Sequence, residues 1–104
     1  MSAKTAASPV SANVVGPVLR AGELANAVIE AAREDNPGKE VVVVDHVAYV
    51  RVGVDHECLL NRDTVERHLG RPFIMAELET DLAAIAGQLE VTESSMRFFF
   101  NKSF

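Results

Sequence analysis

Two valine-rich segments separated by a short polar turn constrain the fold more than any other feature of this sequence. Residues 41–44 are all valine, and residues 47–54 alternate between valine or alanine and other side chains. β-Branched residues favour strands, and a period of two directs alternate side chains to opposite faces. Asp45-His46 suits a turn, so the two segments are predicted to form an antiparallel hairpin. Within residues 47–54, Tyr49 and Arg51 should point outward, and the side chains that face the core should be Ala48, Val50, Val52 and Val54.

The other elements are predicted by helical or alternating spacing of apolar residues and by the residues that end them. Asn36-Pro37-Gly38 stops a helix, and Asp63 with Glu66 resembles the capping box that starts one. Gly70 suits the left-handed position after a helix that ends at Leu69. The predicted helices are residues 22–35, 63–69 and 75–82, and the predicted strands beside the hairpin are residues 13–20, 57–61, 85–91 and 96–100.

The order of these elements predicts an α+β fold, with two principal helices packed on a mainly antiparallel sheet. Pro17 cannot donate to a ladder, so residues 13–20 are predicted to be an edge strand. Residues 57–61 should complete a meander with the hairpin. Residues 1–12 show no sustained period and contain few large apolar side chains. We therefore expect a flexible N-terminal tail, followed by one domain over residues 13–104.

Charge and cysteine usage narrow the classes of partner and compartment. The 104-residue chain carries 15 Asp and Glu against 10 Lys and Arg, a formal net charge of −5. This balance excludes phosphate-driven nucleic-acid binding and favours a basic or neutral partner. A single cysteine, Cys58, cannot form an internal disulfide, which suits a reducing compartment. With no signal peptide and no apolar run near the ~18 residues of a membrane span, we expect a cytoplasmic protein without a membrane partner.

Residues that could perform chemistry are few and dispersed. Cys58 falls inside a predicted strand, where packing is its expected role. His46 and His56, each beside an aspartate, could in principle hold a metal ion, but a strand over residues 47–54 would separate them by roughly 33 Å. The glycines form no phosphate-binding loop. We therefore predict no catalytic, cofactor-binding or metal-binding residues.

Two other patterns suggest contact with a partner. Glu77, Glu79 and Asp81 alternate with apolar residues near the end of a helix, which fits either a solvated face or a cationic groove on a partner. Consecutive strand residues point to opposite faces, so in Phe98-Phe99-Phe100 the middle ring should point away from the core. Phe99 is then expected either to be covered by a helix or the tail, or to contact another protein.

The order and spacing of several short motifs identify a family resemblance over nearly the whole body of the chain. The motifs are NVVGPVLRAG at residues 13–22, DNPGKE at 35–40, YVR at 49–51, LGRPF at 69–73 with MAELE at 75–79, and AGQ at 86–88 with RFFF at 97–100. The sequence resembles the small effector, or coupling, proteins of multicomponent bacterial di-iron monooxygenases. It is most similar to the toluene monooxygenase type, and less so to the phenol hydroxylase regulatory protein and methane monooxygenase component B.

The resemblance implies a cofactor-free, non-catalytic regulatory protein. Such a protein docks on the di-iron hydroxylase and tunes oxygen activation, coupling and substrate access for aromatic or alkene oxidation. A Rieske ferredoxin or reductase is expected to compete for the same face. The resemblance assigns partner binding to Asn13, Arg20, Asn36, Lys39, Arg71, Met75, Glu77 and Phe99. Two readings from other classes stay open: a small-molecule-binding α+β regulatory module, and a small metalloenzyme built on His46 and His56.

Overall fold

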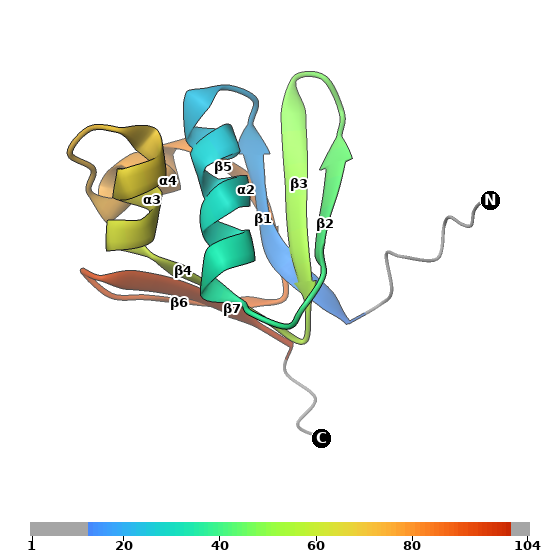
Figure 1. Cartoon of the computed structure of the whole chain (residues 1–104). Helices are drawn as coiled ribbons and strands as arrows, with labels where there is room; N and C mark the ends of the chain where they lie inside the picture. The colour runs from blue at the N-terminus through green and yellow to red at the C-terminus, as the bar shows by residue number, and fades with distance from the viewer. Residues whose placement is uncertain (1–12, 101–104) are drawn as a thin grey trace.

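Two antiparallel sheets and three helices make up the fold in the computed structural model, which describes residues 13–100 (Figure 1). The predicted tail over residues 1–12 lies outside the described residues, as do residues 101–104. The first sheet has the order β2 (Val41–Asp45), β3 (Tyr49–Asp55), β1 (Val14–Arg20), β5 (Leu82–Ala86). The second has the order β4 (Glu57–Asn61), β7 (Ser95–Phe99), β6 (Gln88–Val91). The helices are α2 (Glu23–Asp35), α3 (Arg62–Leu69) and α4 (Met75–Asp81). The predicted α+β class is confirmed.

The core lies where α2 meets both sheets. Figure 1 shows α2 against one face of the four-stranded sheet, with its C-terminal end over the three-stranded sheet. Small and branched side chains recur along the buried side of the helix, which lets the helix approach the valines of the sheet closely. The fully buried core includes Val28 and Ala31 from α2, Val15, Leu19, Val52 and Val54 from the first sheet, and Leu60, Met96 and Phe98 from the second.

The predicted hairpin is confirmed as β2 and β3, with Val43 opposite Val52. Its turn is longer than Asp45-His46 alone. His46 N donates to Tyr49 O at 2.8 Å, and Val47 takes a φ of 74° with its side chain 88% exposed. The second strand therefore starts at Tyr49 rather than at residue 47. Val50, Val52 and Val54 are buried as predicted, but Ala48, predicted to face the core, is exposed because it belongs to the turn.

The prediction of an edge strand over residues 13–20 is wrong, because β1 lies between β3 and β5. β1 pairs with β3 at Val15 and again at Val18, but not at the intervening Gly16 and Pro17. Proline thus interrupts the ladder without moving the strand to the edge. A Cβ on Gly16 would lie 2.0 Å from the carbonyl oxygen of Val52, so glycine is what allows β3 to approach β1 here.

Two further strand predictions differ from the structure at corners of the chain. Residues 57–61 form β4 but no meander with the hairpin, because the chain turns at His56, with a φ of 68°, and β4 pairs with β7. The strand predicted over residues 85–91 begins earlier and breaks at Gly87, whose φ is 95°. Glycine tolerates that left-handed conformation, and the break passes the chain from the first sheet to the second.

The second helix is confirmed, but the predicted capping box is wrong. α3 starts at Arg62 with Asn61 as N-cap and without a side-chain capping bond. Glu66 instead accepts a hydrogen bond from Phe73 N at 2.9 Å and so closes the turn that follows the helix. That turn begins at Gly70, which takes the expected left-handed conformation with a φ of 79°.

Candidate partner-binding surfaces

Arg71 joins three segments at one end of the molecule. Its Nη2 lies 2.6 Å from Glu77 Oε2 on α4 and 3.3 Å from Glu23 Oε2 at the start of α2. The hydrogen bond from Arg71 lowers the pKa of Glu77, so this carboxylate stays charged under mildly acidic conditions. All three side chains are at least a third exposed. The structure thus brings the predicted residues Arg71 and Glu77 together as a charged group that a partner can reach.

Met75, also predicted to bind a partner, is 7% exposed and belongs to the core. It borders a surface hollow of about 340 Å³, lined by Arg62, Ile74, Met75, Ala76 and Glu93. The large apolar side chain that this end presents to solvent is the neighbouring Ile74, which is 63% exposed. Periodicity could not separate the two residues, because both are apolar and adjacent at a helix start.

Asn13, Lys39 and Phe99 lie near the opposite end, around the corner at His56. Asn13 O accepts a hydrogen bond from His56 N at 2.8 Å, and Lys39 Nζ donates to Asp55 O at 3.0 Å. Phe99 points away from the core, as alternation predicts, and is half-buried beneath the guanidinium of Arg97, 4.4 Å from its ring centroid. Arg97 lies on the same strand, so the cover found over Phe99 among the described residues is not a helix; the tail, which the sequence also offers as a cover, lies outside the described residues.

Asn36 has a structural role. It is 7% exposed and caps the C-terminus of α2, where its Nδ2 donates to Ala32 O at 2.8 Å. The same amide donates to Leu59 O at 3.0 Å and accepts from Leu59 N at 2.9 Å. β4 is an edge strand in its sheet, so the amide supplies hydrogen bonds that another strand would otherwise provide.

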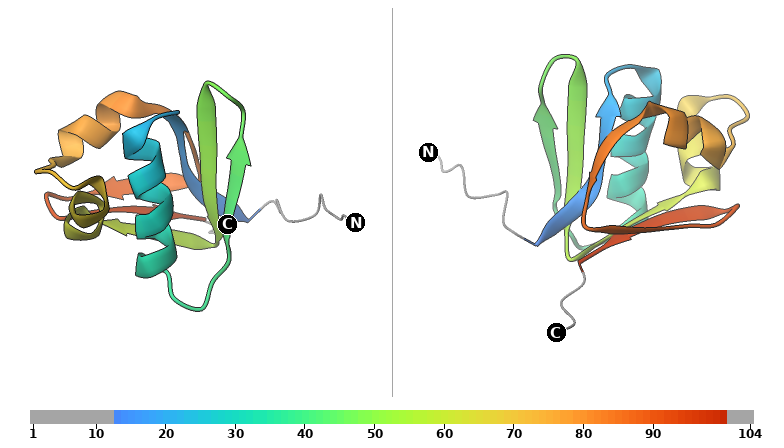
Figure 2. Two further views of the ribbon diagram at one scale, coloured as in Figure 1. Left: turned by 45° about the horizontal axis from the view of Figure 1, so that its top comes forward. Right: turned by 180° about the vertical axis from the view of Figure 1, so that it is seen from behind.

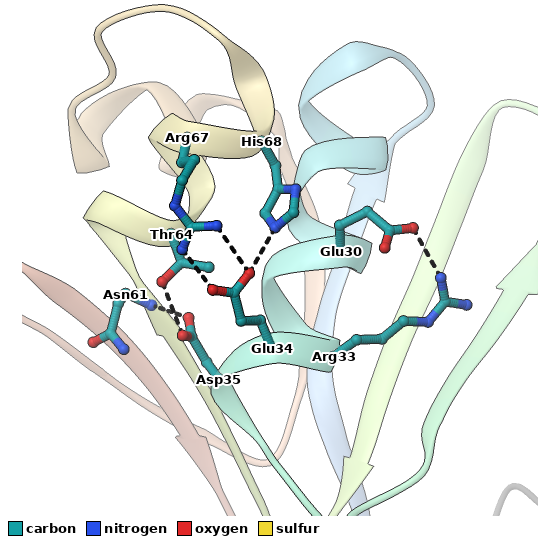
Figure 3. A network of polar contacts seen from close by, with 8 residues as sticks. All are labelled: Glu30, Arg33, Glu34, Asp35, Asn61, Thr64, Arg67 and His68. Atoms are coloured by element: carbon teal, nitrogen blue, oxygen red, sulfur yellow. Dashed lines mark hydrogen bonds and ion pairs between the residues drawn. The ribbon is translucent and has the colours of Figure 1, made fainter.

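A polar network binds α2 to α3, and sequence reasoning did not find it (Figure 3). Glu34 accepts hydrogen bonds from Arg67 Nη2 at 2.6 Å and lies 2.9 Å from His68 Nε2. These contacts lower the pKa of Glu34 to about 2, chiefly through the hydrogen bond from Arg67. Asp35 accepts from Thr64 Oγ1 at 2.9 Å and from Asn61 N at 2.8 Å. His68 therefore contributes to the contact between the two helices.

Arg20 is the last residue of β1, exposed and opposite Tyr49, and precedes Glu23 by three positions in the chain. The structure thus divides the predicted partner-binding residues into two groups, with Asn36 in the interior and Arg20 at the end of β1: Arg71, Met75 and Glu77 form one group, and Asn13, Lys39 and Phe99 form the other. Within residues 13–100, no group of three or more His, Cys, Asp or Glu side chains could hold a metal ion. No helix in the same part of the chain is long and apolar enough to cross a membrane.

Comparison with known proteins gives matches across almost all of the described residues. The chain matches the MmoB/DmpM family over residues 13–99. The effector subunit of the alkene monooxygenase system of Xanthobacter autotrophicus (strain ATCC BAA-1158 / Py2) is 46% identical over 88 residues, which cover 85% of this chain and 87% of that protein. The phenol 2-monooxygenase stimulatory component DmpM of Pseudomonas sp. (strain CF600) is 35% identical over 63 residues, 61% of this chain and 68% of that protein.

Solved structures give the same result. Two structures of a phenol hydroxylase–regulatory protein complex each contain a chain that is 25% identical to this one. The TM-scores are 0.71 and 0.66, and the matches cover 85% and 84% of this chain and 98% and 99% of the other. The family match spans more than four fifths of the sequence and agrees with both relatives and both folds. This chain belongs to the MmoB/DmpM family.

Proposed function

We propose that this protein is the cofactor-free effector subunit of a multicomponent monooxygenase. It binds the hydroxylase component and adjusts oxygen activation, coupling and substrate access, without turnover of its own. The observation that carries this proposal is the 46% identity, over most of both chains, to a protein named as an alkene monooxygenase effector subunit. The relative named as a phenol monooxygenase stimulatory component supports the same class of function.

Such an effector acts through a difference in affinity. It shifts the hydroxylase toward an active conformation only as far as it binds that conformation more tightly than the inactive one. Reversible binding favours partly exposed polar contacts, because these can be exchanged between intramolecular and partner groups. Arg71 and Glu77 at one end, and Lys39 at the other, have this character.

The proposed contact residues are those predicted from the sequence, without Asn36. Asn36 is excluded because its amide is buried and occupied by Ala32 and Leu59. Met75 acts by supporting the exposed Ile74 beside it. The remaining members are Asn13, Arg20, Lys39, Arg71, Glu77 and Phe99.

The proposal places the protein in the cytoplasm with its hydroxylase, where an electron donor, a Rieske ferredoxin or a reductase, competes for the hydroxylase. Competition predicts an optimum in effector concentration. Product formation should rise as effector is added, then fall when excess effector displaces the donor. Raising the donor concentration should move that optimum to a higher effector concentration.

The test is a reconstituted monooxygenase assay with the cognate hydroxylase, its reductase and its ferredoxin. Product formed and peroxide released per NADH are measured with and without this protein at equal stoichiometry. A small alkene and a phenol are the first two substrates, because the two relatives are named for alkene and phenol oxidation. We expect a several-fold rise in product with less peroxide. No change at saturating protein would overturn the proposal.

A further inference from the structure

The four-stranded sheet has one face that α2 covers and one face that no described element covers. The right-hand view of Figure 2 shows the molecule from behind, where β2, β3 and β1 lie beside α2 and no helix is drawn over these strands. Strand register assigns the side chains to this face. Val18 and Val44 both lie opposite Arg51, and Arg20 lies opposite Tyr49, so these side chains point the same way. We call this set the outer sheet face: Val18, Arg20, Val42, Val44, Tyr49 and Arg51.

Side chains of the outer sheet face are more exposed than the inward-facing residues of the central strand β3, although on the edge strand β2 the inward-facing Val43 is itself 36% exposed. Val52 and Val54, which point inward, are completely buried. Val18, Val42 and Val44 are only half-buried, and Tyr49 is 42% exposed. The described residues therefore leave an apolar strip on this face in contact with solvent.

The two arginines on this face differ from the other arginines of the described residues because neither pairs with a carboxylate. Eight of the ten Lys and Arg residues lie within residues 13–100, together with all 15 Asp and Glu. Six of the eight have acceptors: Arg33, Arg62, Arg67, Arg71 and Arg97 pair with carboxylates, and Lys39 donates to a backbone carbonyl. The side chains of Arg20 and Arg51 make no hydrogen bond or ion pair within the described residues. In a protein with an excess of acid, the two arginines without a carboxylate both lie on the outer sheet face.

We propose that the outer sheet face binds the hydroxylase, and that Arg20 and Arg51 each receive a carboxylate from an acidic strip flanked by apolar side chains on that subunit. This inference rests on the proposed effector function. Arg51 lies between valines of two neighbouring strands, so a partner that covers them also removes water from the guanidinium. A desolvated cation without a counter-ion is costly, so the partner must supply an acceptor there. Arginine and tyrosine are also the residue types that contribute most at interface centres.

Charge complementarity favours this occupant over two others. A second copy packed on the same face by two-fold symmetry would place the arginines of the two copies close together, and like charges repel. Residues 1–12 include Lys4 and no acidic residue, so they offer no side-chain counter-ion for an arginine. An acidic strip on the hydroxylase is attracted by the two arginines of the outer sheet face and repelled by the acidic remainder of this protein. The charge distribution therefore also favours one orientation of binding.

Charge reversal at Arg51 and Arg20 tests the proposal. The variants are Arg51→Glu and Arg20→Glu, and the matched control is Arg33→Glu, which makes the same charge change on α2, where Arg33 pairs with Glu30. The Kd for the cognate hydroxylase is measured by titration, together with the effector concentration that gives half-maximal product formation. We expect both quantities to rise more than tenfold for Arg51→Glu, to rise for Arg20→Glu, and to stay within twofold of wild type for Arg33→Glu.

The outcomes separate this inference from the proposed function. If wild type stimulates the hydroxylase and both arginine variants bind as tightly as wild type, the outer sheet face is not the docking surface, while the effector function stands. If wild type neither binds nor stimulates, both proposals fail.

A neutral variant covers the case in which Arg51→Glu does not fold, which circular dichroism would show. Arg51→Gln keeps most of the side chain and removes the charge. Its Kd should rise several-fold and should depend less steeply on salt than that of wild type, because one ion pair is missing. An unchanged Kd and salt dependence would overturn the proposal. So would sedimentation of the free protein as a dimer that Arg51→Glu dissociates, because a second copy would then occupy the face.

Discussion

Replacing Asn36 with alanine should destabilise the protein without removing a partner contact. The substitution deletes two hydrogen bonds to the backbone of Leu59 and one to Ala32 O. Each such bond contributes a net 0.5–1.5 kcal/mol, so we expect the free energy of unfolding to fall by about 3 kcal/mol. The unfolding entropy of a chain of this length is about 0.2 kcal/mol per kelvin, so the melting temperature should fall by about 14 °C.

The assay is thermal and urea unfolding followed by circular dichroism. Asn26→Ala is the matched control, because it makes the same chemical change at an exposed position of α2 and should not lower the melting temperature. Binding of Asn36→Ala to the hydroxylase is then measured well below its melting temperature, where a Kd within twofold of wild type is expected. A melting temperature within about 2 °C of wild type, together with lost binding, would refute the structural role and return Asn36 to the docking surface.

Three further predictions concern a carboxylate, a thiol and a glycine. Because Arg67 and His68 lower the pKa of Glu34 from 4.5 to about 2, the stability that Glu34 contributes is present above pH 4.5 and is lost as the pH falls toward 2. Urea unfolding should show this loss in wild type but not in Glu34→Gln, and parallel pH profiles would contradict it. Burial raises the pKa of the Cys58 thiol to about 12, so a thiol reagent at pH 8 should label it only in denaturant; fast labelling of the folded protein would contradict its burial. Gly16→Ala places a Cβ against the backbone of β3 and should lower the melting temperature well beyond the effect of an exposed substitution, whereas a wild-type melting curve would exclude that close approach.

The family could be recognised from the sequence because its motifs are short and ordered, but the sites could not. The sequence predicts both Arg71 and Glu77 as site residues, but not that they pair with each other or that Arg71 also binds Glu23, 48 positions away. Asn36 was assigned to docking because it lies in a characteristic motif, and only its contacts across 23 residues to Leu59 show that it supports an edge strand. Outward alternation predicted the exposure of Tyr49 and the direction of Arg51. It could not show that no carboxylate within residues 13–100 pairs with Arg51.

The sequence by itself determined the local structure: the hairpin within residues 41–54, the end of α2 at Asn36-Pro37-Gly38 and the left-handed turn at Gly70. These features depend on side-chain alternation and on the dihedral preferences of proline and glycine, which act over a few residues. The tertiary structure alone decided that β1 is central despite Pro17, and that β4 leaves the hairpin to pair with β7. Strand neighbours are chosen by burial of apolar faces across the whole chain, so no local pattern could contain that information.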